Sequence, residues 1–411
     1  MKGVVLSKDE DVTEIISLAE SLDYKIEKVF IQKKEEDASY YLGKGKIEEV
    51  KEYIEKNDIK IAFVNDALRP SQWYNLEKTL RVEVYDRIRL IVEIFMRRAK
   101  RREAKLQVNL AKLQYEKPFV RELFHRTSEK DRPGFLGGGE YVVADYYEMI
   151  KKRIKKIKYE LKKIEEDRGL VRKEREEKGF YVVAITGYTN AGKSSILKAL
   201  TGDDVEIDDR LFTTLSTKTK KLAKSSLPIL LIDTVGFIKD LPHWLINAFH
   251  STLEEISFSD LILLVVDSSD NDNILIEKIK ASLKEIYILK EEPKIIIVMN
   301  KIDKIKREEM EKKIKIVEEN FNIKTIPISA LTGENIDLLI YEIENCLPFS
   351  YLELRIPEKE KTFISWIWEN SNVLDFSVDG TANLKIKCSE KLKEIIKGKC
   401  NKLGGEVKIW K

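Results

Sequence analysis

The segment Gly187-Tyr-Thr-Asn-Ala-Gly-Lys-Ser194 follows an apolar run at residues 181–185 and precedes a helical pattern. A strand, a glycine-containing turn and a helix N-terminus together form a cradle for phosphate. Lys193 would contact the β- and γ-phosphate oxygens, and Ser194 would place its hydroxyl on Mg²⁺. This order predicts an α/β domain with a phosphate-binding loop. We expect nucleotide contacts from Gly187, Tyr188, Thr189, Asn190, Ala191, Gly192, Lys193, Ser194 and Ser195.

Three later segments, each after an apolar run, indicate that the nucleotide is GTP. Asp233-Thr-Val-Gly236 can hold Mg²⁺ through water and reach the γ-phosphate with a backbone N–H. In Asn300-Lys-Ile-Asp303, the carboxylate can accept hydrogen bonds from guanine N1–H and N2–H₂, whereas adenine would leave it unpaired. Ser329-Ala-Leu331 resembles the loop that contacts guanine O6 in GTPases. The predicted contacts are Asp233, Thr234, Val235, Gly236, Asn300, Lys301, Ile302, Asp303, Ser329, Ala330 and Leu331.

The segment Leu211-Phe-Thr-Thr-Leu215 contains the threonine expected to sense the γ-phosphate. Switch loops of GTPases order a segment through contacts with Mg²⁺ and the γ-phosphate. The segment resembles the FxTL switch of translational GTPases, which favours Thr214 over Thr213, although either could be a plain loop residue. The expected Mg²⁺ ligands are Ser194, Thr214 and, through water, Asp233. The expected switch contacts are Leu211, Phe212, Thr213, Thr214 and Leu215.

Phe237 follows Gly236 at the position where Ras-like GTPases carry a water-orienting glutamine. Because phenylalanine cannot orient water, two interpretations stay open. Phe237 packs against the switch, or intrinsic hydrolysis is slow and a partner reorganises the site. Asn190 suggests a bound K⁺ in the role of an arginine finger, as in GTPases with a similar loop. The predicted catalytic residues are Lys193, Thr214, Gly236 and Asn190.

The chain of 411 residues has a net charge of +3 that is unevenly distributed. Residues 97–178 contain 25 basic and 15 acidic side chains, a local charge of +10. This uneven distribution of charge suggests a polyanionic partner, although runs of charged residues usually belong to solvated helix surfaces. The sequence shows no transmembrane segment, no signal-peptide pattern and three scattered cysteines, which predicts a cytoplasmic protein with reduced thiols.

Two apolar stripes predict a helical arm. Ile150, Ile154 and Ile157 begin a row of mainly apolar side chains that are alternately four and three residues apart, as on one face of a helix. Residues 88–113 contain a comparable row. Neither helix could bury its stripe alone, so we expect an antiparallel pair. Residues 118–147 would form a flexible tip loop, because the tip is rich in glycine. RNA contacts, with a mobile loop as the alternative, are expected from Arg126, Arg132, Phe135, Arg97, Arg98 and Arg101.

The remaining residues predict two smaller domains. Residues 1–86 alternate strands and helices, as is typical of a small parallel α/β domain. Residues 351–411 follow the β-α-β-β-α-β order of a ferredoxin-like α+β domain. The predicted organisation is an N-terminal α/β domain at 1–86, an antiparallel helical arm at 87–178, a P-loop GTPase domain at 179–348 and a C-terminal α+β domain at 349–411.

Several segments resemble the HflX family of GTPases. They are Gly43-Lys-Gly-Lys46, Asn65-Asp-Ala-Leu-Arg-Pro-Ser-Gln-Trp73, Asp86-Arg87, Arg101-Arg-Glu-Ala-Lys-Leu-Gln-Val108 and Asp233-Thr-Val-Gly-Phe-Ile-Lys-Asp-Leu-Pro-His243. The resemblance implies a GTPase whose N-terminal domain and arm approach the rRNA of the large ribosomal subunit, and which can split or rescue stalled ribosomes. Tyr141-Val-Val-Ala-Asp-Tyr-Tyr147 replaces a polar stretch of the family. Large-subunit binding is therefore better supported than splitting.

Together these features predict a GTP-binding and GTP-hydrolysing protein that uses Mg²⁺ and associates with the large ribosomal subunit in translation, ribosome rescue or splitting, or ribosome biogenesis. Two alternatives stay open, a nucleotide-dependent RNA remodeller and a GTP-regulated scaffold with little turnover. A monomer is expected, because the two arm helices would bury each other's stripes.

Overall fold

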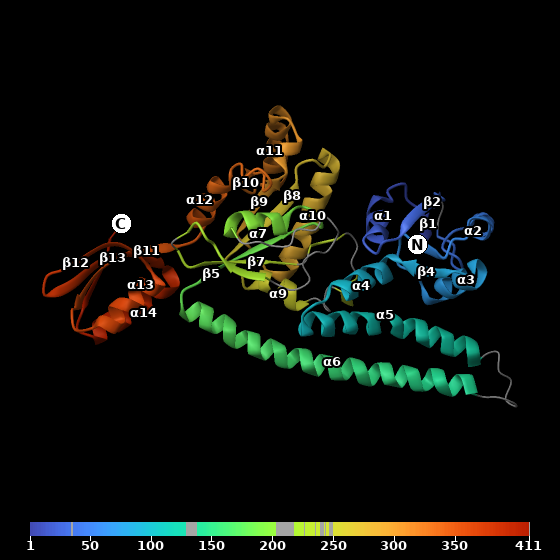
Figure 1. Cartoon of the computed structure of the whole chain (residues 1–411), viewed down its shortest axis with the longest axis horizontal. Helices are drawn as coiled ribbons and strands as arrows, with labels where there is room; N and C mark the ends of the chain where they lie inside the picture. Colours follow the sequence, from blue (N-terminus) through green and yellow to red (C-terminus); the bar gives the residue numbers. More distant parts are fainter. Residues whose placement is uncertain are drawn as a thin grey trace. The chain divides into compact units, whose positions relative to one another are not determined.

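The computed structural model, drawn in Figure 1, describes residues 1–33, 36–128, 138–202, 218–225, 227–234, 236–238, 242, 244–245 and 250–410. The described residues form two compact units. The first includes the described residues within 1–164 and 240–250, and the second includes those within 165–208, 216–239 and 251–411. The four domain boundaries given above stay a prediction. Among the described residues, no helix is long and apolar enough to cross a membrane.

The first unit begins with the parallel α/β domain that the sequence predicts. Its elements are β1 (Lys2–Ser7), α1 (Thr13–Glu20), β2 (Lys25–Ile31), α2 (Lys44–Asn57), β3 (Ile61–Val64), α3 (Pro70–Leu80) and β4 (Glu83–Asp86). The sheet has the order β2-β1-β3-β4 with every pair parallel. Val4 and Phe30 pack on one face against Val50 of α2 and Leu76 of α3. Strands buried in this way account for the apolar runs in the sequence.

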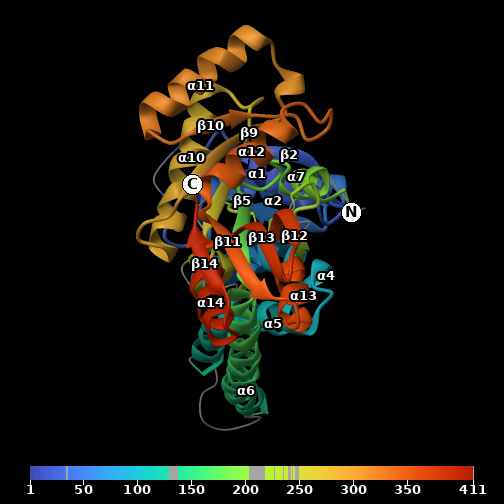
Figure 2. The ribbon, with the colours of Figure 1, turned by 90° about the vertical axis from the view of Figure 1, so that its left-hand side faces the viewer.

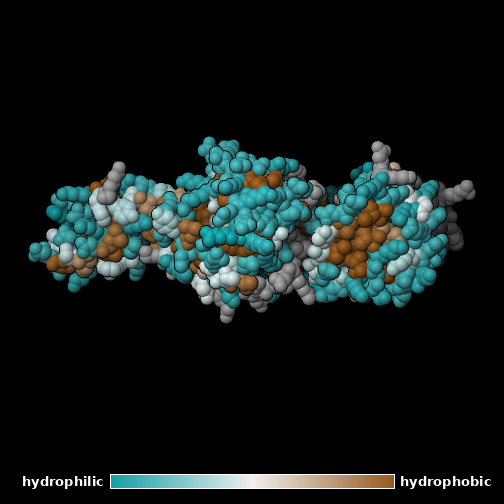
Figure 3. Space-filling model, turned by 90° about the horizontal axis from the view of Figure 1, so that it is seen from above, coloured by the Kyte–Doolittle hydropathy of each residue, from teal (hydrophilic) through white to brown (hydrophobic). Residues whose placement is uncertain are grey.

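The surface of this domain is not uniformly polar. Figure 3 shows a compact hydrophobic patch on the N-terminal domain, whereas the rest of that view is mainly hydrophilic. β2 is one of the two outer strands of the sheet, and Ile31 at its end is 37% exposed.

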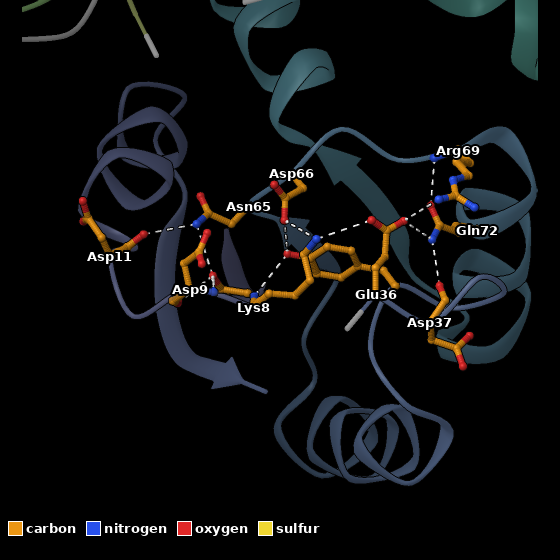
Figure 4. Close-up of polar contacts among 11 residues, drawn as sticks. Lys8, Asp9, Asp11, Glu36, Asp37, Asn65, Asp66, Arg69 and Gln72 are labelled. Carbon is orange, nitrogen blue, oxygen red and sulfur yellow. Dashed lines mark hydrogen bonds and ion pairs between the residues drawn. The ribbon is translucent and has the colours of Figure 1, made fainter. Parts of the chain in front are cut away.

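Polar side chains gather where β1 and β3 end, as Figure 4 shows. The buried Tyr41 donates a hydrogen bond to Asp66 Oδ2 at 2.6 Å, and burial raises the pKa of the Tyr41 phenol. The fully buried Gln72 donates from Nε2 to Glu36 Oε1 at 2.7 Å and to the Asp37 carbonyl at 2.8 Å. Motif residues 65–73 thus hold the connection between β2 and α2. The network also includes Lys8, Asn65 and Arg69.

Replacing Gln72 with Ala should destabilise the N-terminal domain by about 1–3 kcal/mol, because the Glu36 carboxylate and the Asp37 carbonyl lose the buried amide that donates to them. Hydrogen–deuterium exchange of the amides of β1 and β3 in the full chain measures the local free energy of opening. Lys78→Ala, an exposed position on the same helix, is the control. Equal exchange in the two variants would contradict a stabilising role for the network.

The helix after β4 differs from the prediction. α4 (Arg87–Arg98) buries Ile88, Ile91 and Phe95, and Arg87 pairs with Glu14 of α1 at 2.8 Å. α4 therefore packs in the N-terminal domain. The chain leaves the helix at Ala99, whose backbone is extended, and α5 (Arg102–Ser128) follows. The prediction of one helical stripe over residues 88–113 was wrong, because the extended backbone at Ala99 separates two consecutive helices, α4 and α5.

α5 pairs with α6 (Gly138–Glu177), which confirms the antiparallel arm (Figure 1). Leu110, Leu113 and Val120 pack with Ile150 and Ile157. The predicted tip loop was too long, since residues 118–128 and 138–147 are helical and residues 129–137 lie outside the described residues.

An apolar contact beyond Pro118 explains why α5 continues. The Phe119 ring lies 5.3 Å from the Trp73 ring, and Phe119 and Val120 are each 8% exposed. Burial of these side chains offsets the backbone hydrogen bond that a proline inside a helix removes.

The second unit contains a sheet of order β10-β9-β8-β5-β7-β6, in which only β6 and β7 pair antiparallel. Its strands are β5 (Tyr181–Gly187), β6 (Lys218–Lys221), β7 (Ile229–Asp233), β8 (Leu261–Asp267), β9 (Ile295–Asn300) and β10 (Thr325–Pro327). Its helices are α7 (Lys193–Thr201), α9 (His250–Ser257), α10 (Asp272–Leu289), η1 (Ile302–Lys304), α11 (Arg307–Phe321) and α12 (Ile336–Cys346). Because the carboxyl ends of parallel strands share one edge, the loops after β5, β7, β8 and β9 meet there.

The second unit ends with the predicted ferredoxin-like fold. Its elements are β11 (Phe349–Pro357), α13 (Lys361–Asn370), β12 (Asn372–Val378), β13 (Thr381–Ser389), α14 (Glu390–Lys402) and β14 (Glu406–Ile409). The antiparallel order is β12-β13-β11-β14, and Figure 2 shows this sheet with α13 and α14. Lys391 binds Asp260 at 2.8 Å, which joins α14 to the loop before β8.

Candidate nucleotide-binding site

The phosphate-binding loop between β5 and α7 requires two glycines. At Gly187, φ is +142° and a Cβ would lie 2.1 Å from the Val265 carbonyl oxygen. At Gly192, φ is +92° and a Cβ would lie 2.2 Å from Asn300 Nδ2. Neither position can hold a side chain without displacing a neighbouring element. The backbone of the predicted loop is therefore fixed by close packing on β8 and β9.

Lys193 lies at the centre of the site. Its side chain is buried, and Nζ donates a hydrogen bond to the Tyr188 carbonyl at 2.7 Å. Gly236 lies beside it, because a Cβ there would be 2.7 Å from Lys193 Nζ. Burial lowers the pKa of Lys193 to about 8; Asp233 opposes this shift, and Lys301 adds to it. A phosphate group would supply the counter-charge that this buried amine lacks.

Nucleotide affinity should fall above pH 8. The ammonium has a pKa of about 8 without nucleotide, and bound phosphate stabilises the charged form and raises that pKa. The complex therefore binds more protons than the free protein above pH 8, and the association constant should decrease by up to about tenfold per pH unit. Calorimetry of GDP binding in buffers of different ionisation enthalpy measures the protons taken up. Absence of proton uptake near pH 8 would contradict the assignment of Lys193 as the group that binds phosphate.

Two of the three predicted Mg²⁺ ligands, Ser194 and Asp233, are among the described residues, and they lie together. Ser194 Oγ donates to Asp233 Oδ2 at 3.1 Å, and Asp233 is fully buried. A hydroxyl and a carboxylate are hard oxygen donors, so this pair fits Mg²⁺. Thr214 lies outside the described residues. So do the other predicted contacts Leu211, Phe212, Thr213, Leu215 and Val235.

Asn300 connects the phosphate loop to the base-recognition loop. Its buried side chain donates from Nδ2 to the Ala191 carbonyl at 2.9 Å and accepts at Oδ1 from the Ala330 N–H at 3.1 Å. Asp303 Oδ1 accepts a hydrogen bond from Ser329 Oγ at 2.5 Å. The structure thus brings the three predicted loops together, and Ser329 fixes the carboxylate proposed to read guanine.

Lys301 holds the opposite side of the phosphate loop. Its Nζ donates to the Asn190 carbonyl at 2.7 Å and to Asp267 Oδ2 at 2.6 Å. Burial raises the pKa of Asp267, but hydrogen bonds from Lys301 and Ser269 outweigh it and hold that pKa below its usual value. Sequence reasoning missed Asp267, although an acidic residue at the end of an apolar strand was the available signal.

Phe237 is buried and bound to the phosphate loop through its backbone. Its N–H donates to the Gly187 carbonyl at 2.9 Å, and its carbonyl accepts from the Thr189 N–H at 2.9 Å. Of the two interpretations left open, this packing favours a structural role. Slow intrinsic hydrolysis stays a prediction.

Of the candidates for RNA contact, Arg97 and Arg98 end α4, and Arg101 directly precedes α5. Arg97 and Arg101 are exposed, Arg98 is half-buried, and Arg97 pairs with Asp23 at 2.6 Å. Arg126 is in α5, whereas Arg132 and Phe135 lie outside the described residues.

Comparisons with known proteins cover nearly the whole chain. The matching families are described as GTP-binding GTPase N-terminal at residues 9–96, GTP-binding GTPase Middle Region at 98–175, 50S ribosome-binding GTPase at 182–301 and HflX C-terminal domain at 314–404.

Two relatives and one solved structure are examples of the proteins that are similar to this chain. GTPase HflX of Thermococcus kodakarensis is 46% identical over 306 residues, which cover 74% of this chain and 69% of the relative. GTPase HflX of Methanocaldococcus jannaschii is 40% identical over 379 residues, 90% of this chain and 92% of the relative. The crystal structure of the SsGBP complex with GDP matches with a TM-score of 0.52 and 30% identity, covering 84% of this chain and 97% of that chain.

Proposed function

This chain belongs to the HflX family of GTPases, and we propose that its GTP cycle controls association with the large ribosomal subunit. The chain binds guanine nucleotides and hydrolyses GTP. In the proposal, the N-terminal domain and the arm contact rRNA, in translation, ribosome rescue or splitting, or ribosome biogenesis. The protein acts as a cytoplasmic monomer.

The charge of the arm is the observation that carries the proposal. Residues 97–178 have a net charge of +10, although the whole chain has only +3. In α6, Lys152 and Lys156 are exposed and one helical turn apart. A positively charged face of this kind suits the phosphates of structured RNA. The matching family described as 50S ribosome-binding GTPase supports the ribosomal subunit as the RNA source.

Large ribosomal subunits should stimulate GTP hydrolysis, and the arm should determine the concentration required. Reversing Lys152 and Lys156 to Glu should raise the half-maximal subunit concentration about tenfold, because at least two phosphate contacts are lost. Lys280→Glu with Lys284→Glu is the matched control, since both lysines are exposed one turn apart on α10. An equal effect of both pairs would indicate general charge repulsion instead of a specific arm contact.

The proposal assigns a role to each predicted residue of the nucleotide site. Lys193 and the Gly236 N–H would contact the γ-phosphate, and Ser194, Thr214 and, through water, Asp233 would hold Mg²⁺. Asp303 reads guanine. Asn190 helps to hold K⁺ near the phosphates, so hydrolysis in KCl should exceed that in NaCl; equal rates would exclude this role. Bound Mg²⁺ would neutralise charge that develops on the phosphate oxygens.

A further inference from the structure

The antiparallel sheet at the end of the second unit has one covered face and one open face. Apolar side chains that alternate along β11 and β13, such as Leu352 and Leu384, pack against α13 and α14, which lie on one side of the sheet (Figure 1 and Figure 2). The intervening side chains point to the other side, because successive residues of a strand alternate between its two faces. We call that side the open face, and its aromatic and basic residues include Tyr351, Arg355, Lys385, Lys387, Lys408 and Trp410.

Two aromatic rings lie next to each other on the open face. Trp410 directly follows β14, and its backbone N–H donates to the Tyr351 carbonyl at 3.1 Å. The two ring centres are 5.5 Å apart, with 65° between the ring planes. Trp410 is 36% exposed and Tyr351 is half-buried, and neither ring belongs to the apolar core under the sheet. Because the water-facing side of an antiparallel sheet usually carries polar side chains, these rings indicate a partner with flat, stackable groups.

Lysine ammonium groups lie over these rings. Lys385 Nζ is 5.8 Å from the centre of a Trp410 ring. Lys387 Nζ is 4.9 Å from the centre of the Phe349 ring and 5.8 Å from that of Tyr351. A flexible lysine gains less from an exposed ring than a stacked nucleobase does. A base could therefore take the place of the ammonium over a ring, and the displaced ammonium would remain close enough to bind the adjoining phosphate.

The acidic residues of the open face leave an excess of positive charge. Asp375 lies 3.8 Å from Lys385 Nζ, and Glu406 is opposite Arg355 in the register of β14 and β11. Glu353 is opposite Lys408 in the same register. Among the described residues of the open face, the four basic residues named above outnumber these three acids. The surplus suits a polyanion, and a carboxylate among the cations can accept hydrogen bonds from the amino group of a base.

We propose that the open face binds unpaired nucleotides of an RNA strand. Bases stack on Tyr351 and Trp410 and are splayed apart, because the two ring planes are steeply inclined. Lys385 and Lys387 bind the phosphates between them. A four-stranded sheet backed by two helices is an architecture on which aromatic side chains of the sheet stack RNA bases. The site lies outside the N-terminal domain and the arm, so this proposal goes beyond the proposed ribosome contact and does not rest on it.

Fluorescence anisotropy of a fluorescein-labelled decauridylate, titrated with the full chain in GDP, tests the proposal. Tyr351→Ala and Trp410→Ala should each raise Kd about tenfold, because each removes one stacked base. Tyr351→Phe keeps the ring and should stay within about twofold of the unmodified chain. Trp368→Ala is the matched control, because Trp368 is a 51% exposed ring on α13, behind the sheet. GDP affinity should be the same in all variants, which shows that they are folded.

Two further measurements separate stacking from charge, and the open face from the arm. Tyr351→Ala should leave the slope of log Kd against log salt concentration unchanged, whereas Lys387→Gln should reduce it by about 0.7, as for one phosphate of a single strand. A blunt RNA duplex keeps its bases paired, so the unmodified chain and Tyr351→Ala should bind it equally.

Several results would overturn the proposal. One is no decauridylate binding up to about 100 µM protein, the weak limit of non-specific affinity. Equal affinity of the unmodified chain, Tyr351→Ala and Trp410→Ala is another. An equal loss in Trp368→Ala would show a general effect on the domain. Binding that is lost only when Lys152 and Lys156 are changed to Glu would assign the RNA contact to the arm, and would leave the proposed ribosome association intact.

Discussion

Lys193→Ala should lower kcat/KM for GTP hydrolysis by about 10³-fold or more, since its ammonium would stabilise the negative charge of the transferred phosphoryl group. Lys193 Nζ is buried next to Gly236 and to the Tyr188 carbonyl. Water cannot replace an ammonium in this position unless the surrounding site reorganises. Both the affinity for GTP and the rate of the hydrolysis step should therefore fall. Single-turnover hydrolysis with excess protein separates the two.

Lys198→Ala is the matched control, because it removes a lysine from the last turn of the same helix. It should retain hydrolysis within about twofold, as expected for a substitution away from the reacting groups. If Lys193→Ala retained near-normal hydrolysis, the assignment of the phosphate loop would be wrong, and a different group would have to stabilise the phosphate charge.

Asp303→Asn should lower GTP affinity by about 10²–10³-fold and create a preference for xanthosine triphosphate. An aspartate accepts from both guanine N1–H and N2–H₂, whereas an asparagine presents an N–H to the 2-amino group. Xanthine carries an oxygen at that position and can accept from the amide. The hydrogen bond from Ser329 Oγ to Oδ1 can be retained, so the side chain keeps its orientation.

Competition between GTP, ATP and xanthosine triphosphate for a fluorescent GDP analogue measures the change in selectivity. Glu308→Gln, an acid on the exposed face of α11, should leave the selectivity unchanged. Loss of GTP binding without a gain for xanthosine triphosphate would show that Asp303 acts through stability of the loop and not through base recognition.

Local patterns were sufficient to predict most of the fold. The strand before Gly187 is buried over its whole length, so its apolar run is continuous in the sequence. Motif residues at strand ends then converge, because parallel strands place their carboxyl ends at one edge of the sheet. This geometry explains why Asn300 and Ser329, far from the phosphate loop in sequence, could be assigned to the same site.

The features that sequence reasoning missed depend on contacts between distant segments. The break between α4 and α5 has no proline or glycine, since residues 99–101 are Ala-Lys-Arg, and the apolar stripe runs through it. Lys301 reaches both Asn190 and Asp267, which no single motif relates. In the same way, Arg172 is one of many charged residues of α6 until the fold places Glu254 opposite it.

In the proposal, GTP controls binding of this GTPase to the large ribosomal subunit. Co-sedimentation of the full chain with purified large subunits from the same source, in a non-hydrolysable GTP analogue and in GDP, measures this control. We expect the analogue to increase the bound fraction at least tenfold, a coupling of about 1.4 kcal/mol or more. Equal binding in both nucleotides, or binding in neither, would contradict the claim.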